Sequence, residues 1–344
     1  MDMHGADAGD LIIVREGGAG VIRLNRPKAI NALTQDMVEG IAAALADFVA
    51  DPAVHLVLFE GEGDRGFCAG GDVRAMRSLV LEDEIEAAGD YLAAEYRMNA
   101  ALAHCPKPTV VLAHGVVMGG GIGIAGHCQF RFAVPGAQFA MPESAIGFLP
   151  DVGANFILAQ APRHRSLAFL MSGVPVGLAD ALALGLCDCR IGDGRRALVR
   201  QAIIAAASAP DPARALSHLV AAETTEAGPP ALMLAADALL DLDWSNPAIA
   251  AAALAATAGF EVTARRSPTS LVATLLVQLA ARRLGTIDAV LALEWRVGHW
   301  LVTQPDFVEG VRAVLIDKDH APRWSPLHID QVDRTTIDRI VSTP

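Results

Sequence analysis

The stretch that decides the fold is "PTVVLAHGVVMGGGIGIAG", residues 108–126, in which an apolar run leads into a cluster of glycines. The run "PTVVLAHGVV" has almost no polar residues, which is typical of a strand buried on both faces of a parallel sheet. "VHLVLFEGEG", residues 54–63, has the same character, and helical patterns lie between and after the two runs. Parallel strands in an α/β layer follow. The longer tract nearly reaches membrane-spanning length, but its histidine and glycines argue against a span.

The flanking segments extend this layer in both directions. "LIIVREGGAGVIRLNRP", residues 11–27, predicts two alternating strands joined by a glycine turn. "NALTQDMVEGIAAALADFVAD", residues 31–51, has the 3.6-residue spacing of an amphipathic helix. "QFRFAVPGAQFAM", residues 129–141, predicts two more strands around a Pro-Gly turn.

The pattern becomes helical toward the C-terminus. After residue 153 the chain is rich in Ala and Leu, and beyond about 210 it is almost wholly helical, with proline and glycine punctuation. We therefore expect an α/β core over residues 1–210 and a helical C-terminal region over residues 211–344.

Composition limits the classes of function. The chain has 344 residues, is 53% hydrophobic and carries a formal net charge of −12. This composition excludes a disordered chain and argues against a nucleic-acid surface or an anionic membrane face. The N-terminus "MDMHGADAGD" lacks the basic start and apolar core of a signal peptide, so we expect a cytoplasmic protein. The cysteines form an odd set without a CxxC motif and are interpreted as reduced thiols. They are Cys68, Cys105, Cys128, Cys187 and Cys189.

A first candidate binding motif is "GFCAGGDVRAM", residues 66–76, which follows a buried strand after a short polar turn. Adjacent glycines leave backbone N–H groups open to a ligand, which suits an oxyanion or a phosphate. Spacing alone favours the simpler alternative, an ordinary turn in which Asp72 caps the next helix.

A second candidate is "GVVMGGGIGIAG", residues 115–126, whose Gly121, Gly123 and Gly126 have the GxGxxG spacing of a dinucleotide fold. An acid, Glu143, follows about 20 residues on. We reject that fold because the strand after these glycines should end at the acid, whereas "QFRFAV" ends well before Glu143. The glycines more simply permit close packing and a ligand at a helix N-terminus.

The third candidate is "MPESAIGFLPDVG", residues 141–153, where Glu143 and Asp151 stand without a neighbouring Lys or Arg. Either residue alone could cap a helix or turn. Together with the two glycine clusters, the acids suggest a reaction in which a carbonyl oxygen gains charge while a carboxylate attacks the carbon or activates water.

Several segments resemble, in chain order, those of the crotonase (enoyl-CoA hydratase/isomerase) superfamily. The tail and "MPE…GFLPDVG" look like its 3-hydroxyisobutyryl-CoA hydrolase branch. The resemblance implies a crotonase-like ββα superhelix with a twisted, mostly parallel sheet and a helical C-terminal region. The segments are "NRPKAINALT", "FCAGGD", "HGVVMGGGIGIAGHCQFRFA", "FAMPESAIGFLPDVGANF", "GLADALALGLCD" and "RSPTSL…EWR…PDFVEGVRAVLIDKDHAPRWSP".

The resemblance also assigns roles. The amides of Gly71 and Gly120 would form the oxyanion hole for the thioester oxygen, with Gly120 also contacting the substrate. Hydratases of the superfamily place a first glutamate where this chain has Gly123, so half of their acid pair is missing. In the hydrolase branch Glu143 and Asp151 form the catalytic pair instead. Glu143 would attack the thioester carbon or take a proton from water.

Further residues follow from the same resemblance. Glu95 would contact the acyl end of the substrate, although a solvated helix face is nearly as good an interpretation. Lys28, Ala69, Asp72 and Lys318 would bind CoA. No metal site is expected from His104, His114 and His127, because no pair has helical ligand spacing with a nearby acid.

The expected function is hydrolysis of a short β-hydroxyacyl-CoA, 3-hydroxyisobutyryl-CoA by resemblance, as in valine catabolism. CoA enters as part of the substrate and no cofactor is expected. The alternatives are an enoyl-CoA hydratase or isomerase and a non-catalytic acyl-CoA-binding protein. Superfamily members usually form oligomers, so a homo-oligomer without nucleic-acid or membrane partners is expected.

Overall fold

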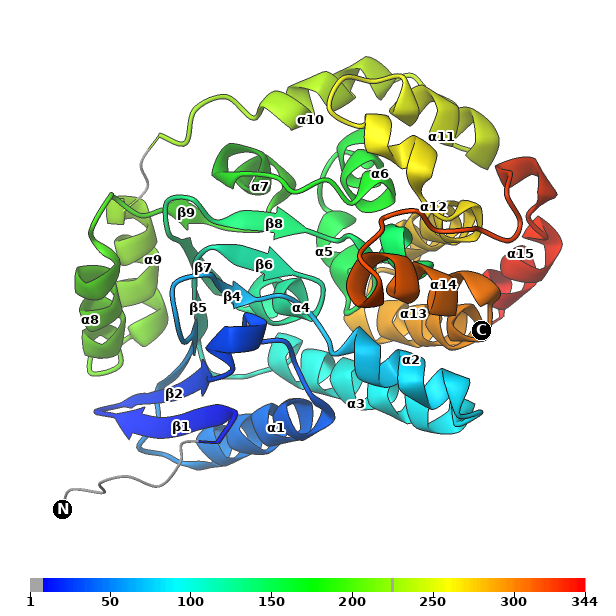
Figure 1. The fold of residues 1–344 in the computed structure, drawn as a ribbon. Helices are drawn as coiled ribbons and strands as arrows, with labels where there is room; N and C mark the ends of the chain where they lie inside the picture. The colour runs from blue at the N-terminus through cyan, green and yellow to red at the C-terminus, as the bar shows by residue number, and fades with distance from the viewer. Residues whose placement is uncertain (1–8, 224–225, 344) are drawn as a thin grey trace. The chain divides into compact units, whose positions relative to one another are not determined.

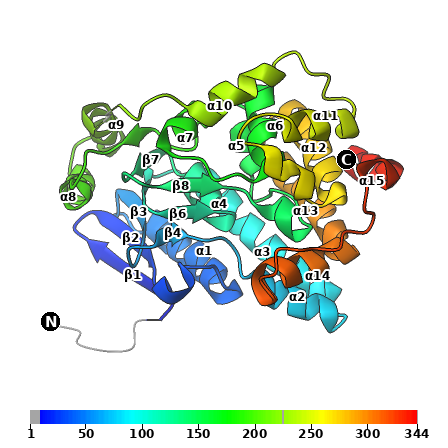
Figure 2. The ribbon, with the colours of Figure 1, turned by 45° about the horizontal axis from the view of Figure 1, so that its top comes forward.

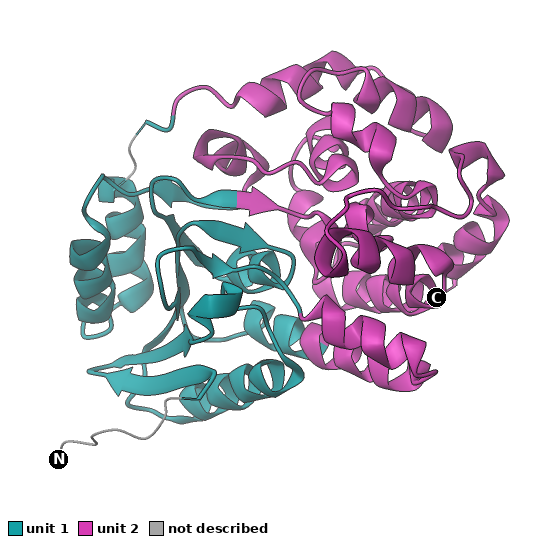
Figure 3. Cartoon of the chain, in the orientation of Figure 1, with its two compact units in different colours: residues 1–71, 97–138, 186–227 teal, residues 72–96, 139–185, 228–344 magenta. Residues whose placement is uncertain are grey.

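The computed structural model describes residues 9–223 and 226–343, and the chain divides into two compact units (Figure 3). Each unit is assembled from three separate segments of the chain. Unit 1 takes residues 1–71, 97–138 and 186–227, and unit 2 takes residues 72–96, 139–185 and 228–344.

Unit 1 is built on a six-stranded sheet with the strand order β1-β2-β3-β5-β7-β9. β1 and β2 pair antiparallel, and every later neighbour pairs parallel. The two apolar runs of the sequence are confirmed as buried strands of the parallel part. The strands are β1 (Leu11–Glu16), β2 (Ala19–Leu24), β3 (Leu56–Gly61), β5 (Thr109–Ala113), β7 (Phe130–Ala133) and β9 (Cys189–Arg190).

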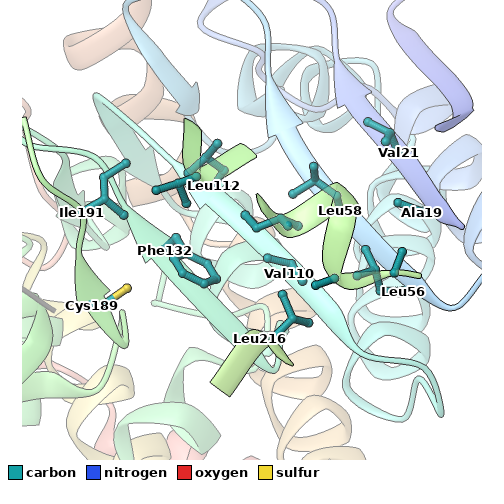
Figure 4. Packing of buried hydrophobic residues seen from close by; sticks show 14 residues of the cluster. Ala19, Val21, Leu56, Leu58, Val110, Leu112, Phe132, Cys189, Ile191 and Leu216 are labelled. Carbon is teal, nitrogen blue, oxygen red and sulfur yellow. The ribbon is translucent and has the colours of Figure 1, made fainter. Parts of the chain in front are cut away.

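One face of this sheet is covered by α8 (Arg196–Ala206) and α9 (Pro212–Glu223). The strand register places Val21 beside Leu58 and Leu58 beside Val110, so apolar side chains form rows across the strands. These rows pack against buried side chains of the two helices, among them Leu216 (Figure 4). Both ribbon views show α8 and α9 along this face (Figures 1 and 2).

The opposite face is covered by α1 (Gln35–Ala50). The Thr34 side chain accepts a hydrogen bond from the Met37 amide and so caps the start of this helix. At Gly20 the helix comes so close that a Cβ would lie 2.5 Å from the Phe48 ring. Burial on both faces explains why the strands lack the polar alternation of a half-exposed sheet.

The two glycine motifs belong to a second layer of unit 1. β4 (Gly66–Cys68) pairs parallel with β6 (Val116–Met118), and α4 (Gly120–His127) follows β6 directly. The 3-10 turn η1 (Pro27–Ala29) carries the "RPK" segment between β2 and α1. β8 (Gln138–Ala140) and α3 (Ile85–Ala103) each cross a boundary between the units in the sequence.

Unit 2 is largely helical, and α12 (Pro268–Leu284) is its most deeply buried long helix. α12 contacts α5, α6, α13 and α15, so it forms the centre of the unit. The other helices are α2 (Val73–Leu81), α5 (Ala154–Leu158), α6 (Arg163–Ser172), α7 (Leu178–Leu184), α10 (Ala231–Ala236), α11 (Pro247–Ala255), α13 (Ile287–Val302), α14 (Pro305–Val311) and α15 (Arg334–Ser342). Shorter turns are the 3-10 segments η2 (Glu143–Ile146), η3 (Asp237–Leu239), η4 (Glu261–Arg265) and η6 (Ile329–Gln331) and the π-helical η5 (Arg312–Ile316).

The expected division at residue 210 does not coincide with a division in the structure. α9 lies beyond residue 210 but belongs to unit 1, because Leu216 is fully buried in the core of that unit. Residues 139–185 lie before 210 but belong to unit 2. Helical pattern in the sequence identifies a helix without indicating which core it covers.

Two further expectations bear on the fold. All five cysteines are free thiols, as expected, and all five are buried. None of the described helices has both the length and the apolar character needed to span a membrane.

Candidate active site

The predicted acid pair is buried within unit 2. Glu143 is the first residue of η2 and is 8% exposed, and Asp151 lies in the turn before α5 and is 6% exposed. Burial raises the pKa of Glu143 well above its ordinary value, and the charges of Asp151 and Glu95 raise it further. The three carboxyl groups therefore lie close enough to influence one another's ionisation.

Asp151 does not cap the following helix, so the alternative interpretation of this residue as a helix cap is wrong. α5 begins at Ala154 with Gly153 as its N-cap, and the backbone carbonyl of Asp151 accepts the Ala154 amide at 2.8 Å. The carboxylate instead accepts a 2.6 Å hydrogen bond from the Tyr96 hydroxyl, which comes from α3. Burial raises the pKa of Asp151, whereas the hydrogen bond from Tyr96 lowers it. Tyr96 thus favours the ionised form of Asp151.

Glu95 is 3% exposed, so the interpretation as a solvated helix face is wrong. Its Oε1 is buried and has no hydrogen-bond partner within the described part of the chain. Burial, with a contribution from the charge of Asp151, raises its pKa. The structure thus places Glu95 where the charge of Asp151 reaches it, and its contact with a substrate stays a prediction.

Arg266 supplies a cation near Glu143. Burial lowers the pKa of Arg266 to about 10, and the charge of Glu143 opposes this effect. The Nε atom donates to the Ser172 carbonyl at 2.7 Å, which fixes the guanidinium. The sequence around Glu143 contains no basic residue, so this partner comes from a segment more than 100 residues away.

A fourth buried carboxylate, Glu294, lies against the turn that carries Asp151. Its Oε2 accepts the Gly153 amide at 2.7 Å, and its Oε1 accepts the Asn155 side-chain amide at 2.8 Å. Burial raises the pKa of Glu294, whereas the hydrogen bonds from these N–H groups lower it and so favour the ionised form. Asp151, Glu143, Glu95 and Glu294 thus form a cluster of buried acids in unit 2.

Sequence reasoning gave no role to Tyr96, Asn155, Arg266 or Glu294. A signal existed for Glu294, which occupies the apolar stripe of α13 at helical spacing from Leu291 and Leu301. A charged residue at such a position is rarely buried unless it is paired. No comparable signal marks Asn155 or Arg266.

The predicted oxyanion-hole residues, Gly71 and Gly120, lie in unit 1. Their loops adjoin, because a Cβ on Gly70 would lie 3.6 Å from the Gly120 nitrogen and one on Gly121 would lie 2.6 Å from the Cys68 carbonyl oxygen. Gly120 is the first residue of α4, where an amide has no carbonyl within its own helix. The structure therefore brings the two glycine motifs together.

The expected CoA contacts are distributed over both units. Lys28 and Ala69 belong to unit 1, where the Ala69 amide donates to the Ile30 carbonyl at 2.9 Å and Lys28 is exposed. Asp72 belongs to unit 2 and caps α2 by accepting the Ala75 amide at 3.3 Å, as the simple alternative predicted. Lys318 is exposed after η5 in the same unit. Contact of these four residues with CoA stays a prediction.

Within residues 9–223 and 226–343, no group of three or more His, Cys, Asp or Glu side chains could hold a metal ion.

Known proteins are similar to this chain in both sequence and fold. The enoyl-CoA hydratase/isomerase family matches residues 19–341. The mitochondrial 3-hydroxyisobutyryl-CoA hydrolases of Homo sapiens and Gallus gallus are 33% and 32% identical, covering 96% and 97% of this chain and 88% and 89% of theirs.

Two crystal structures are similar over nearly their whole length. A carnitinyl-CoA dehydratase from Mycobacterium thermoresistibile is 34% identical with a TM-score of 0.87, covering 98% of this chain and 97% of that one. An enoyl-CoA hydratase from Rhodobacter sphaeroides is 34% identical with a TM-score of 0.86, covering 97% of each chain.

Proposed function

Because this chain belongs to the enoyl-CoA hydratase/isomerase family, we propose that it hydrolyses the thioester of a short β-hydroxyacyl-CoA. The names of its curated relatives favour 3-hydroxyisobutyryl-CoA as the substrate, which would place the enzyme in valine catabolism. The single observation that carries the proposal is the buried pair of Glu143 and Asp151, whose charges influence each other. Gly123, where hydratases of the superfamily have a glutamate, supplies no side-chain acid.

The electrostatics of the pair suit acid and base chemistry. Both pKa values are raised, so the pair retains a proton near neutral pH. Tyr96 favours charge on Asp151, and Arg266 favours charge on Glu143. Two acids that share a proton can act as a base and an acid in one cycle, because one is ionised while the other donates.

The roles follow from this division. When the shared proton lies on Asp151, the ionised Glu143 either attacks the thioester carbon to form an anhydride, which water then cleaves to the free acid, or takes a proton from the attacking water. The C–S bond breaks, and the departing thiolate of CoA takes the proton that the pair retains. Asp151 positions the water or the substrate hydroxyl. The amides of Gly71 and Gly120 bind the thioester oxygen as its negative charge develops. CoA is part of the substrate, and no cofactor takes part in this scheme.

The test is release of the CoA thiol from a panel of thioesters, including 3-hydroxyisobutyryl-CoA and crotonyl-CoA. Wild-type protein should cleave the β-hydroxyacyl ester, and Glu143→Gln and Asp151→Asn should each lower kcat by about 10²- to 10⁴-fold. The exposed Glu84→Gln is the matched control and should be unchanged. Wild-type turnover by Glu143→Gln would refute the assignment, and binding of the esters without turnover would indicate a non-catalytic binding protein.

A second candidate is hydration of an enoyl-CoA, favoured by the names of the two similar crystal structures. The same panel decides between the two functions. Conversion of crotonyl-CoA to its hydrated ester, at a rate matching or exceeding thiol release from the hydroxyacyl ester, would support the hydratase.

A further inference from the structure

We infer that Glu294 is a positioning residue for Asp151: its buried carboxylate clamps the turn over residues 150–155 and so fixes where the Asp151 side chain lies. This inference rests on the proposed function, since it assigns Glu294 a part in the same reaction. The sequence pattern marks Glu294 as an unusual acid in an apolar stripe but gives it no role, and the names of the similar proteins give it none.

The clamp joins the chain on both sides of Asp151. Glu294 accepts hydrogen bonds from the Gly153 amide at 2.7 Å, the Asn155 side-chain amide at 2.8 Å and the Asn155 backbone amide at 3.4 Å. The same Asn155 side chain donates to the Pro150 carbonyl at 2.8 Å. Glu294 therefore holds the residues after Asp151 directly and the residue before it through Asn155.

The turn needs such a restraint because its backbone is unfavourable. Val152 has φ = 52° and Gly153 has φ = 77°, so two consecutive residues adopt the left-handed region. Glycine tolerates this region, but a β-branched valine there is an outlier. A strained conformation persists only where surrounding contacts determine it. Without the clamp, the turn would relax and Asp151 would leave its place beside the Tyr96 hydroxyl.

Packing alone does not explain an acid at this position. Glu294 is 0% exposed, whereas its neighbours along the same stripe of α13 are apolar. A buried carboxylate is costly unless donors satisfy it, and a well-packed apolar side chain often serves stability as well. The N–H groups of the turn are the partners that compensate this cost. The acid is thus matched to the turn rather than to the core.

The far end of α5 is held in a comparable way. Arg282 of α12 donates to the carbonyls of Leu158, Ala159 and Ala161 at 2.7–3.1 Å. A carboxylate from α13 and a guanidinium from α12 therefore fix the two ends of one short helix. This arrangement gives the Asp151 turn a rigid support from the centre of unit 2.

The experiment compares Glu294→Gln with a matched control, Asp180→Asn. Gln keeps the shape of Glu294 but replaces one acceptor with a donor that faces the N–H groups of the turn. Asp180 is also buried in unit 2 and also accepts a backbone amide, that of Met233 at 2.9 Å, but it holds a different segment. Thioester hydrolysis, thermal unfolding and hydrogen exchange of a peptide covering residues 148–158 are measured for both variants.

We expect Glu294→Gln to lower kcat by about 10- to 100-fold while KM changes less than about threefold, because a misplaced group costs the chemical step more than binding. Exchange at Gly153 and Asn155 should accelerate about tenfold, as expected for a lost hydrogen bond. Asp180→Asn should change neither quantity, even if it lowers Tm equally. Combining Glu294→Gln with Asn155→Ala should give a non-additive loss of kcat, since both act on one turn.

The inference is overturned if exchange in the turn is unchanged, or if exchange accelerates while kcat stays at the wild-type value. It is also overturned if Asp180→Asn reproduces the kinetic loss. Failure of the proposed function gives a different result, because then the wild-type protein itself cleaves no thioester on the panel. The exchange measurement still decides in that case whether Glu294 holds the turn.

Discussion

The proton held by Glu143 should make the stability of the protein depend on pH in a way that Glu143→Gln removes. Burial raises the pKa of this carboxyl well above its ordinary value of 4.5, and Asp151 and Glu95 add to the rise. Above about pH 5 the unfolded chain releases a proton that the folded protein keeps. Stability therefore falls as pH rises, until the pH reaches the pKa of the folded state.

The magnitude follows from one proton. Each proton retained on folding changes the free energy of unfolding by about 1.4 kcal/mol per pH unit. Between about pH 5.5 and 7.5, the variant should therefore gain stability relative to wild type, by at most about 3 kcal/mol for a proton retained over the whole interval. Other titrating groups are common to both proteins and largely cancel in the comparison. The glutamine amide does not titrate, so any constant cost of burying it also drops out.

The assay is urea unfolding followed by tryptophan fluorescence at both pH values, with the exposed Glu84→Gln as control. The control should track wild type at each pH. An equal difference between wild type and Glu143→Gln at both pH values would refute the reasoning. Glu143 would then hold no extra proton, and the acid and base roles assigned to the pair would lose their physical basis.

Three further predictions follow from particular contacts. Tyr96→Phe removes the hydrogen bond that lowers the pKa of Asp151. The acid limb of the plot of kcat/KM against pH should therefore move to higher pH by about one unit. An unmoved limb would contradict this coupling. Gly121→Ala places a Cβ 2.6 Å from the Cys68 carbonyl oxygen. The free energy of unfolding, measured by urea titration, should therefore fall by about 1–3 kcal/mol. An unchanged midpoint would show that the loops carrying Cys68 and Gly121 do not touch. The five thiols are buried, and burial raises the pKa of Cys187 and Cys189 to about 12. A thiol reagent at neutral pH should therefore react with the cysteines only after the protein unfolds. Rapid labelling of the native protein would disprove this.

The parts of the fold that sequence predicts are those written in local patterns. The run around Val110 has no polar alternation, and it forms a strand buried on both faces. Gly120 and Gly121 stand at the start of α4, where the sequence placed a helix after a strand. Glu143 and Asp151 were identifiable because acids without basic neighbours stand out in an apolar segment.

Other features could not be read locally because they depend on contacts between distant segments. Whether Glu95 faces solvent or the interior depends on which element packs against α3. Arg266 reaches Glu143 only after the chain has folded, and the three donors of Glu294 come from a turn more than 130 residues earlier. The boundary between the two units could not be predicted for the same reason. The sequence pattern of α9 is helical whichever core the helix packs against.

The interleaving of the two units limits how the chain can be cut. A fragment that stops at residue 210 would lack α9. The apolar side chains of the sheet that pack against Leu216 would then be exposed to water. The same fragment would keep Glu143 and Asp151 but lose two residues that act on them. Arg266 favours charge on Glu143, and Glu294 accepts the Gly153 amide in the turn that carries Asp151. Attempts to shorten the protein for expression or for gene fusion should therefore leave both ends in place and add any partner at a terminus.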